Sequence, residues 1–222
     1  MKAFTEENIR ECTAAAQSIA EEINALPHIT LDSLGDKCAL VVVDIVNGFV
    51  REGAMAAPAV EGIIPNSAEL VKRFCDKKMP VAAFADCHKK DCAEFLSFPE
   101  HCLDGTSESE IVDEIKAAGS YRLIKKNSTN GFHEKEFLDF MEENPDVETY
   151  VVIGDCTDIC VMQFCLSLRT WFNCRDMKDK SIIVPVDCVE TYDAPFHSGA
   201  FTNIAAYKLM KDSGVKFVGS IK

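Results

Sequence analysis

The stretch Tyr150-Val-Val-Ile-Gly-Asp-Cys-Thr-Asp-Ile-Cys160-Val-Met162 joins an apolar run to the start of an amphipathic segment. Residues 150–153 are typical of a buried strand, and residues 158–169 have the spacing of a helix. The stretch therefore predicts a strand that passes directly into a helix. Cys160 lies at the start of that helix, where unpaired backbone N–H groups and the helix dipole favour a thiolate. It is either a nucleophile or a small core residue.

The same alternation extends along the chain in both directions. Apolar runs typical of strands lie at residues 39–46, 81–85, 121–124, 150–153, 181–186 and 216–218. Amphipathic segments typical of helices lie at residues 67–78, 109–118, 135–143, 158–169 and 198–212, with Gly119 and Gly214 at expected helix ends. This pattern predicts an α/β fold, a three-layer doubly wound sheet of six mainly parallel strands with helices on both faces.

A different pattern precedes the first strand. Apolar residues repeat at helical spacing through Ile9, Cys12, Ala16, Ile19, Ala20 and Ile23. They predict an amphipathic helix over residues 5–25 that ends near Pro27. Because no repeat, low-complexity tract or linker follows, we expect a single domain over residues 1–222, with residues 1–36 as an N-terminal helical extension. This helix would pack on the outside of the domain or on a partner subunit.

Charge and cysteine content limit the classes of partner. The chain has 23 basic and 36 acidic residues, a net charge of −13, which disfavours nucleic acid and anionic membrane surfaces. The N-terminus lacks the apolar core of a secretion signal, and the longest apolar run, residues 38–43, is far too short to span a membrane. The 11 cysteines are therefore expected to be reduced thiols in a cytoplasmic protein.

Reactive side chains follow four of the predicted strands. They are Asp44 after the first strand, Asp86 and His88 after the second, Lys125 and Lys126 after the third, and Cys160 after the fourth. In open parallel sheets, ligands bind beyond the carboxyl ends of the strands. The sequence therefore predicts a site at this edge of the sheet.

A thiol, a carboxylate and an ammonium group are sufficient for acyl transfer. Cys160 would attack a carbonyl carbon to form a thioester, and Asp44 would move the proton and later activate water. Lys126 would keep Asp44 ionised, and the backbone N–H groups of Cys156 and Cys160 would receive the oxyanion. The structural alternatives are a helix-capping role for Asp44 and a solvated loop position for the lysine.

A second group of polar residues follows the second strand. Asp86, His88, Glu94 and His101 supply oxygen and imidazole nitrogen donors that suit zinc, manganese or iron(II). Nearby cysteines offer a sulfur-rich structural zinc site instead, although their spacing is unusual for one; they are Cys87, Cys92 and Cys102. The remaining alternative is a polar loop that binds no metal.

Taken together, these segments resemble the isochorismatase-like cysteine hydrolases, and among them the nicotinamidase group, from about residue 40 to residue 218. Four motifs carry the resemblance: residues 43–49 around Asp44, residues 124–132 around Lys126, residues 154–161 around Cys160, and the loop from Asp86 to Thr106. The last of these distinguishes nicotinamidases, because relatives acting on isochorismate or carbamoyl amides generally lack its metal ligands.

The resemblance implies specific roles. One divalent metal ion would be held by Asp86, His88 and His101, with Glu94 in place of a histidine found in some members. Phe49 and Phe98 would flank the substrate ring, whose nitrogen the metal would hold. The resemblance also implies a cis peptide at Asp155–Cys156. Of the candidate metals we favour zinc, with manganese or iron(II) as alternatives.

The implied reaction is the hydrolysis of nicotinamide to nicotinate and ammonia through a Cys160 thioester. The implied binding partner is a small amide. A homo-oligomer is one assembly that the sequence leaves open. Two other functions stay open. One is a hydrolase of the same superfamily that acts on another small amide and has a vestigial metal loop. The other is a catalytically silent metal- or thiol-binding protein.

Overall fold

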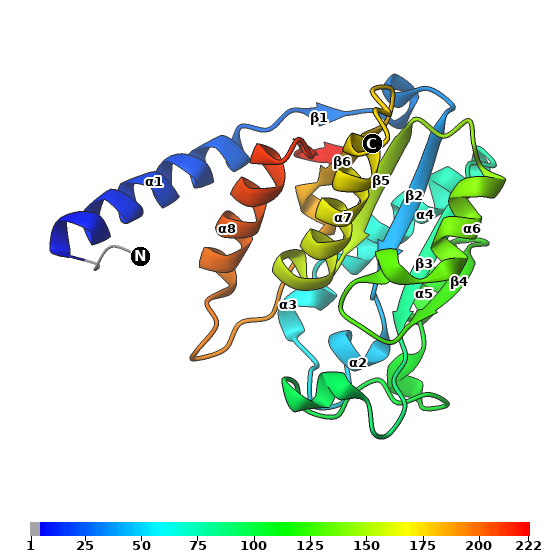
Figure 1. Cartoon of the computed structure of the whole chain (residues 1–222), viewed down its shortest axis with the longest axis horizontal. Coiled ribbons are helices and arrows are strands. Elements are labelled where there is room, and N and C mark those ends of the chain that lie inside the picture. The colour runs from blue at the N-terminus through cyan, green and yellow to red at the C-terminus, as the bar shows by residue number, and fades with distance from the viewer. Residues whose placement is uncertain (1–4) are drawn as a thin grey trace.

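The computed structural model describes residues 5–222. At its centre lies a six-stranded sheet in the order β4-β3-β2-β5-β6-β7, and every neighbouring pair is parallel (Figure 1). The strands are β2 (Cys38–Val43), β3 (Val81–Asp86), β4 (Arg122–Lys126), β5 (Thr149–Gly154), β6 (Ser181–Pro185) and β7 (Lys216–Val218). The predicted doubly wound sheet of six strands is confirmed.

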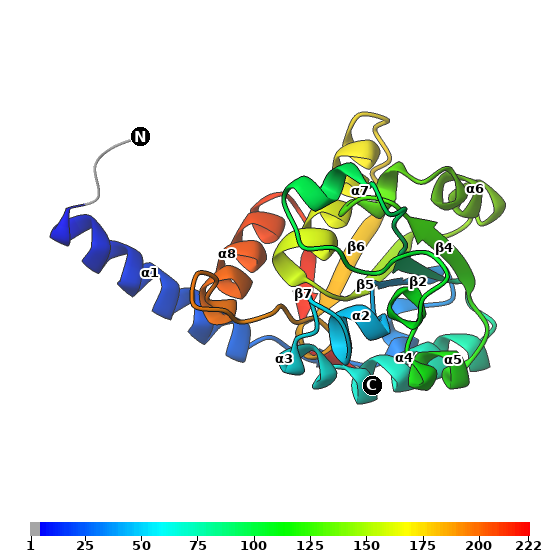
Figure 2. The same cartoon turned by 90° about the horizontal axis from the view of Figure 1, so that it is seen from below.

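The chain reverses direction across the sheet between β2 and β5. After β2 the next two strands add toward one edge, whereas β5, β6 and β7 add toward the other edge. Such a switch point leaves a crevice at the carboxyl ends of the two central strands, where ligands bind in this class of fold. Figure 2 views the molecule from below, the side toward which these carboxyl ends point in Figure 1.

Helices cover both faces of the sheet and bury its strands. On one face lie α4 (Ile64–Asp76) and α5 (Asp113–Ala118), and on the other lie α6 (Lys135–Glu143), α7 (Met162–Asn173) and α8 (Gly199–Asp212). Alternate side chains of β2 divide between the two cores, with Leu40 and Val42 on the first and Val41 on the second. This two-sided burial explains why the strands are continuously apolar in sequence.

Several element boundaries differ from the prediction. The helix predicted over residues 109–118 begins only at Asp113, and the helix predicted over residues 158–169 begins with a π-helical turn, Thr157–Val161. Single-turn elements were not predicted, because one turn is too short to show a periodicity. They are α2 (Asn47–Val50), α3 (Pro58–Glu61) and 3₁₀ turns at Leu31–Leu34, Ala93–Leu96, Ser107–Ser109, Gly131–His133 and Val186–Cys188.

The predicted N-terminal helix is present as α1 (Glu6–Asn24) and projects away from the sheet (Figures 1 and 2). Thr5 and Asn8 form a capping box that fixes its start. None of its residues is buried, and near its end the Glu22 carboxylate accepts hydrogen bonds from Tyr207 and Lys211 of α8. Of the apolar stripe, Ile9 and Cys12 are exposed, whereas Ala16, Ile19, Ala20 and Ile23 are half-buried.

A small parallel pair ties the two ends of the described chain together. β1 (His28–Ile29) pairs with β8 (Ser220–Ile221), directly after α1 and at the C-terminus. Residues 28–34 are thereby attached to the body of the protein, although they belong to the extension predicted over residues 1–36. The single domain over residues 1–222 stays a prediction. Within residues 5–222, no helix combines the length and apolarity needed to cross a membrane.

Candidate active site

Asp44, Lys126 and Cys160 converge at the switch point of the sheet. Lys126 Nζ lies 2.8 Å from Asp44 Oδ2 and 3.9 Å from Cys160 Sγ, and all three side chains are buried. Asp44 directly follows β2 and has a positive φ of 53°, which is uncommon outside glycine. Within residues 5–222, the ion pair with Lys126 is the one contact of hydrogen-bonding length that its carboxylate oxygens make. The carboxylate is therefore available to receive a proton.

Lys126 is the lysine that reaches the site. Its ammonium also lies 2.9 Å from Asp86 Oδ1 and donates to the carbonyl oxygen of Ser128 at 3.0 Å. Burial lowers its pKa, but the surrounding carboxylates outweigh burial and hold the pKa well above its ordinary value. Lys125 points to the other side of β4, where its exposed ammonium donates to Asp104 at 2.7 Å. Strand alternation thus separates the two lysines.

Burial and the helix terminus act on the Cys160 thiol in opposite directions. Burial raises the pKa of the thiol well above its ordinary value; Lys126 opposes this shift, whereas the nearby carboxylates reinforce it. Burial also raises the pKa of Asp44, to about 6, against the opposing effect of Lys126. These directions fit the predicted role of Asp44 as the group that takes the thiol proton.

The ionisation of Asp44 predicts a specific pH profile. A general base must be ionised to act, and the pKa of Asp44 is about 6. We expect kcat/KM to be constant above about pH 7 and to fall about tenfold per pH unit below 6, because one proton blocks the base. The measurement is an initial-rate pH profile with enzyme stability checked at each pH. A profile that stays flat down to pH 4.5 would rule Asp44 out as the base.

The turn that carries Cys160 is shaped by its backbone. The Asp155–Cys156 peptide is cis, as the family resemblance implied. Gly154 has a φ of 122°, and a Cβ atom there would lie 1.9 Å from the Val43 carbonyl oxygen, so that glycine alone fits. Within residues 5–222 the Cys156 N–H donates to no other backbone group outside regular elements. That N–H group is thus free to bind an oxyanion.

Asp86, His88, Glu94 and His101 form a compact cluster, which we call the four-residue cluster. One ligand-type atom from each residue lies within 4.8 Å of all the others. His88 Nε2 lies 3.1 Å from Asp86 Oδ1, and His101 Nε2 lies 3.2 Å from Asp86 Oδ2. The Glu94 carboxylate is 3.7 Å from His88 Nε2. The four residues named from the sequence therefore come together. Within residues 5–222, this cluster contains none of Cys87, Cys92 and Cys102, so the alternative sulfur-rich site does not form here.

The surroundings of the cluster fit a divalent cation. The Nδ1 atom of His88 lies 3.0 Å from Asn127 Oδ1, and that of His101 lies 2.7 Å from the Pro99 carbonyl oxygen. These acceptors assign the ring proton to Nδ1, which directs the lone pair of Nε2 into the cluster. His88 Nε2 is buried and has no hydrogen-bond partner within residues 5–222. Such a donor set suits a metal ion.

The charges around the cluster also favour a bound cation. Burial lowers the pKa of His88, but its contacts with Asp86 outweigh burial and raise the pKa to about 9. Burial raises the pKa of Asp86, but Lys126 and the two histidines hold it well below its usual range. The site thus stabilises additional positive charge, which a divalent ion would supply in place of a proton.

Replacing His101 with alanine tests the ligand assignment. His101→Ala removes one of two imidazole nitrogens from the cluster, so we expect metal affinity to fall more than about tenfold. The measurement is bound metal per chain by elemental analysis after dialysis against a range of free metal concentrations. His133→Ala is the matched control, because His133 is exposed and lies outside the cluster. Equal metal content in the two variants would refute the ligand role of His101.

A small aromatic-walled cavity connects the cluster with Cys160. Phe49 and Phe98 both line it, with ring centroids 5.5 and 6.4 Å from that of His101. The two phenylalanines predicted to flank a ring thus face the same cavity. Four further residues line the cavity. Cys156 was predicted at the site as an oxyanion donor, whereas Met55, Thr129 and Ile159 were not predicted.

Sequence reasoning also missed the residues that orient the cluster. The backbone N–H of Thr129 donates to Glu94 Oε2 at 2.9 Å and fixes the carboxylate, and Asn127 contacts His88. Asn127 and Thr129 lie one and three residues after Lys126. Their position just after a strand that ends in a reactive residue was the signal that could have identified them. Asp155, in the same turn as Cys160, is fully buried, and burial together with the neighbouring Asp44 raises its pKa well above the usual range.

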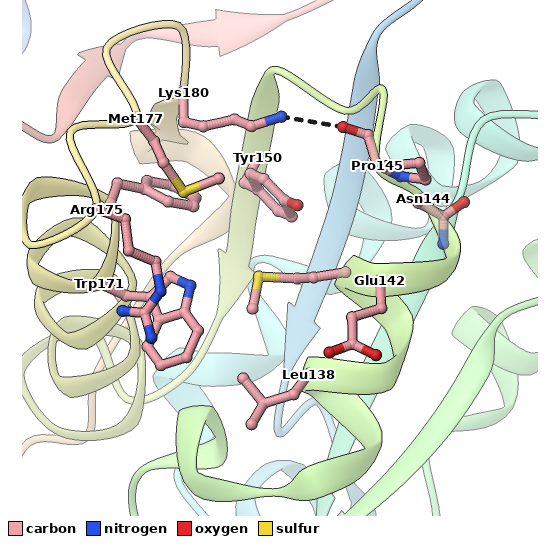
Figure 3. Close-up of a pocket in the computed structure, with 11 residues that line it drawn as sticks. Leu138, Glu142, Asn144, Pro145, Tyr150, Trp171, Arg175, Met177 and Lys180 are labelled. Carbon is pink, nitrogen blue, oxygen red and sulfur yellow. Dashed lines mark hydrogen bonds between the residues drawn. The ribbon is translucent and has the colours of Figure 1, made fainter.

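A separate pocket of about 330 Å³ lies at the opposite end of β5, between α6 and α7 (Figure 3). Tyr150 and Trp171 contribute aromatic walls, and Lys180 Nζ donates to the Pro145 carbonyl oxygen at 3.2 Å. No cysteine or histidine is among the described residues that line it. Asp44, Lys126, Cys160 and the four-residue cluster lie instead at the carboxyl ends of the strands.

A thiol, a carboxylate and an ammonium at the switch point of a doubly wound sheet, beside a metal-type cluster, define a cysteine hydrolase class of site. The chain belongs to the isochorismatase domain family, whose model matches residues 38–211.

Two relatives with similar sequences are both named nicotinamidases. The chain is 36% identical over 177 residues to Nicotinamidase 1 of Arabidopsis thaliana, covering 71% of each chain. It is 25% identical over 161 residues to a nicotinamidase of Acinetobacter baylyi, covering 57% of this chain and 72% of the relative.

Solved structures share the fold. N-carbamoylsarcosine amidase from Thermoplasma acidophilum is 26% identical and superposes with a TM-score of 0.66, over 82% of this chain and 95% of its own. The zinc complex of pyrazinamidase from Pyrococcus horikoshii is 24% identical, with a TM-score of 0.67 over 82% and 98%. At that identity the second likeness establishes the fold alone.

Proposed function

We propose that this protein is a metal-assisted cysteine amidohydrolase that converts nicotinamide and water to nicotinate and ammonia. The observation that carries the proposal is that Cys160, whose thiol lies beside the Asp44–Lys126 pair, lines the same aromatic-walled cavity as three residues of the four-residue cluster, Asp86, Glu94 and His101. An aromatic amide with a ring nitrogen matches both sides of this cavity. The name of the Arabidopsis relative supports nicotinamide as the substrate.

The substrate would lie between Phe49 and Phe98, with its amide directed to Cys160. Asp86, His88, Glu94 and His101 would hold the metal ion, which when bound supplies a Lewis acid for the pyridine nitrogen. We propose zinc, with manganese or iron(II) as alternatives, because two imidazole nitrogens and two carboxylates suit all three. The apolar ring walls would also exclude water from the thiol.

Acylation begins when Cys160 Sγ attacks the amide carbon and its proton passes to Asp44. The carbonyl oxygen becomes an oxyanion that accepts hydrogen bonds from the N–H groups of Cys156 and Cys160. Asp44 then returns the proton to the amide nitrogen, the C–N bond breaks, and ammonia leaves. The product of this half-reaction is a Cys160 thioester.

Deacylation uses the same groups in reverse. Asp44 removes a proton from water, the resulting hydroxide attacks the thioester carbon, and the C–S bond breaks to release nicotinate. The proton on Asp44 returns to Cys160 Sγ, and the carboxylic acid proton of the product passes through solvent to the released ammonia, which gives nicotinate and ammonium. Lys126 stays protonated throughout, because its pKa is held well above the ordinary value, and it offsets the negative charge on Asp44 and sulfur. Atoms and protons balance over the cycle.

A second candidate is a hydrolase of another small amide, which the 26% identity to an N-carbamoylsarcosine amidase favours. Ammonia release from nicotinamide, pyrazinamide and N-carbamoylsarcosine separates the two candidates. We expect nicotinamide to have the highest kcat/KM of the three. A higher value for N-carbamoylsarcosine would transfer the assignment to the second candidate. No release from any amide would favour the catalytically silent alternative.

We further propose a cytoplasmic location and a homo-oligomer. All 11 cysteines are free thiols, which suits a reducing compartment. The exposed outer end of the apolar stripe of α1, Ile9 at 54% exposure and Cys12, supports contact with another subunit. The net charge of −13 supports a small-molecule partner over nucleic acid or a membrane surface.

A further inference from the structure

A groove of about 560 Å³ opens beside the candidate active-site cavity. One wall comes from residues 54–59, which lead into and include the start of α3, and a second from residues 97–99. The third wall comes from the loop between β6 and α8. Met55 and Phe98 line both the groove and the cavity that contains Cys160. The two spaces therefore adjoin, and the Met55 and Phe98 side chains lie between them.

The groove selects for uncharged apolar groups. Most of its lining consists of alanine, proline, methionine and aromatic side chains, and it contains no lysine, arginine or histidine. Its single charged residue, Asp193, already accepts a hydrogen bond from the Gly199 N–H at 2.8 Å. An anionic group would lose hydration here without gaining a cation. Aliphatic or aromatic groups would instead gain from burial.

Two highly exposed apolar side chains flank the groove. Phe196 is 87% exposed and lines it, and Leu96 is 91% exposed and directly precedes the wall formed by residues 97–99. Among the large hydrophobic side chains of the described residues these are the two most exposed. Exposed apolar surface next to a reactive cavity is typical of a binding site.

The wall that carries Phe196 is fixed to the turn that carries Cys160. The Asp158 carboxylate accepts a hydrogen bond from Thr191 Oγ1 at 2.6 Å, and lies 2.8 Å from His197 Nε2. The Tyr192 ring stacks on His197 with 3.8 Å between ring centroids. Because these contacts anchor both ends of the short loop, the groove is already formed in the free protein.

We propose that this groove is an outer subsite for an uncharged, apolar substituent on the ring of the amide substrate. The proposal rests on the proposed function, since it assumes that the ring lies between Phe49 and Phe98 with the amide at Cys160. A substituent passing Met55 and Phe98 enters the groove. The substrate class then includes alkyl- and aryl-substituted aromatic carboxamides as well as the unsubstituted ring.

The test compares nicotinamide with its 5-propyl and 6-propyl derivatives and with their carboxyethyl counterparts, using the metal-loaded full chain. Each buried methylene is worth about a three- to fourfold gain. With two of the three propyl carbons buried, we therefore expect at least one propyl derivative to have a kcat/KM about tenfold above that of nicotinamide. Its carboxyethyl counterpart should fall about tenfold below the propyl compound. Rejection of both propyl derivatives by an enzyme that cleaves nicotinamide would overturn the subsite.

Variants locate the effect in the groove. Phe196→Ala should lower kcat/KM for the preferred propyl derivative about fivefold and change that for nicotinamide less than about twofold. Ala59→Trp, which fills the groove from α3, should act in the same selective way. Phe201→Ala is the matched control, because Phe201 is 62% exposed on α8 and does not line the groove; it should change neither value. Equal effects of Phe196→Ala and Phe201→Ala would overturn the subsite, and failure to cleave nicotinamide would overturn the proposed function with it.

Discussion

Cys160→Ala is expected to lose amidase turnover by about 10⁴-fold or more, with the fold and the bound metal unchanged. Cys160 Sγ is the one sulfur within reach of the Lys126 ammonium, at 3.9 Å. The substitution removes a single sulfur atom from a buried position and leaves the four-residue cluster intact. Cys156 also lines the cavity, but among the described residues the side-chain contacts of the Lys126 ammonium are with Asp44, Asp86 and Cys160. The measurement is ammonia release alongside thermal unfolding and metal content.

Cys165→Ala serves as the matched control for this result. Cys165 is also buried and lies only five residues further along the same helical segment, but it packs into the core against the sheet. We expect this variant to lose some stability and to retain its turnover within about threefold. Turnover in Cys160→Ala that stays near that of Cys165→Ala would contradict the covalent mechanism.

Asp44→Asn is expected to lower kcat by about 10³-fold to 10⁴-fold, because a positioned general base contributes about that much. The amide has nearly the same shape as the carboxylate but cannot accept the thiol proton. At neutral pH the Cys160 thiol depends on this acceptor, since burial holds its pKa well above the ordinary value. Ammonia release measured against pH provides the test. The residual activity of Asp44→Asn should no longer fall below pH 6.

The control for Asp44→Asn is Asp104→Asn. Asp104 also pairs with a lysine of β4, at 2.7 Å from Lys125 Nζ, but this pair is exposed and outside the cavity. Exposed ion pairs contribute little, so we expect turnover within about twofold of the unsubstituted protein. If Asp44→Asn behaves like Asp104→Asn, a different base must act on Cys160.

Much of the fold and of the candidate site was predictable because both depend on short-range patterns. Continuous apolar runs such as residues 150–153 indicate strands buried on two faces, and the ends of parallel strands meet at one edge. This brought Asp44, Lys126 and Cys160 to the same place. Strand alternation also separated Lys126 from Lys125, which differs from it by one position.

Other features depend on contacts between distant segments, which no local pattern reports. The pKa of Cys160 depends on burial, on Lys126 and on the carboxylates of Asp44 and Asp86, which the position of the residue at a helix start does not reveal. The pairing of Asp158 with His197 spans 39 residues. The positive φ of Asp44 was not predicted either, although aspartate is one of the few non-glycine residues enriched in this conformation.

The most direct test of the account is nicotinamide hydrolysis by the purified protein before chelation, after chelation, and after addition of zinc, manganese or iron(II). The account predicts that ammonia release stops on chelation and returns in proportion to metal bound at one ion per chain. The same metal-loaded sample of Cys160→Ala should release none. Undiminished ammonia release from protein shown to be free of metal would contradict the role of the four-residue cluster. Absence of ammonia release from a folded sample that is fully loaded with metal would contradict nicotinamide as the substrate.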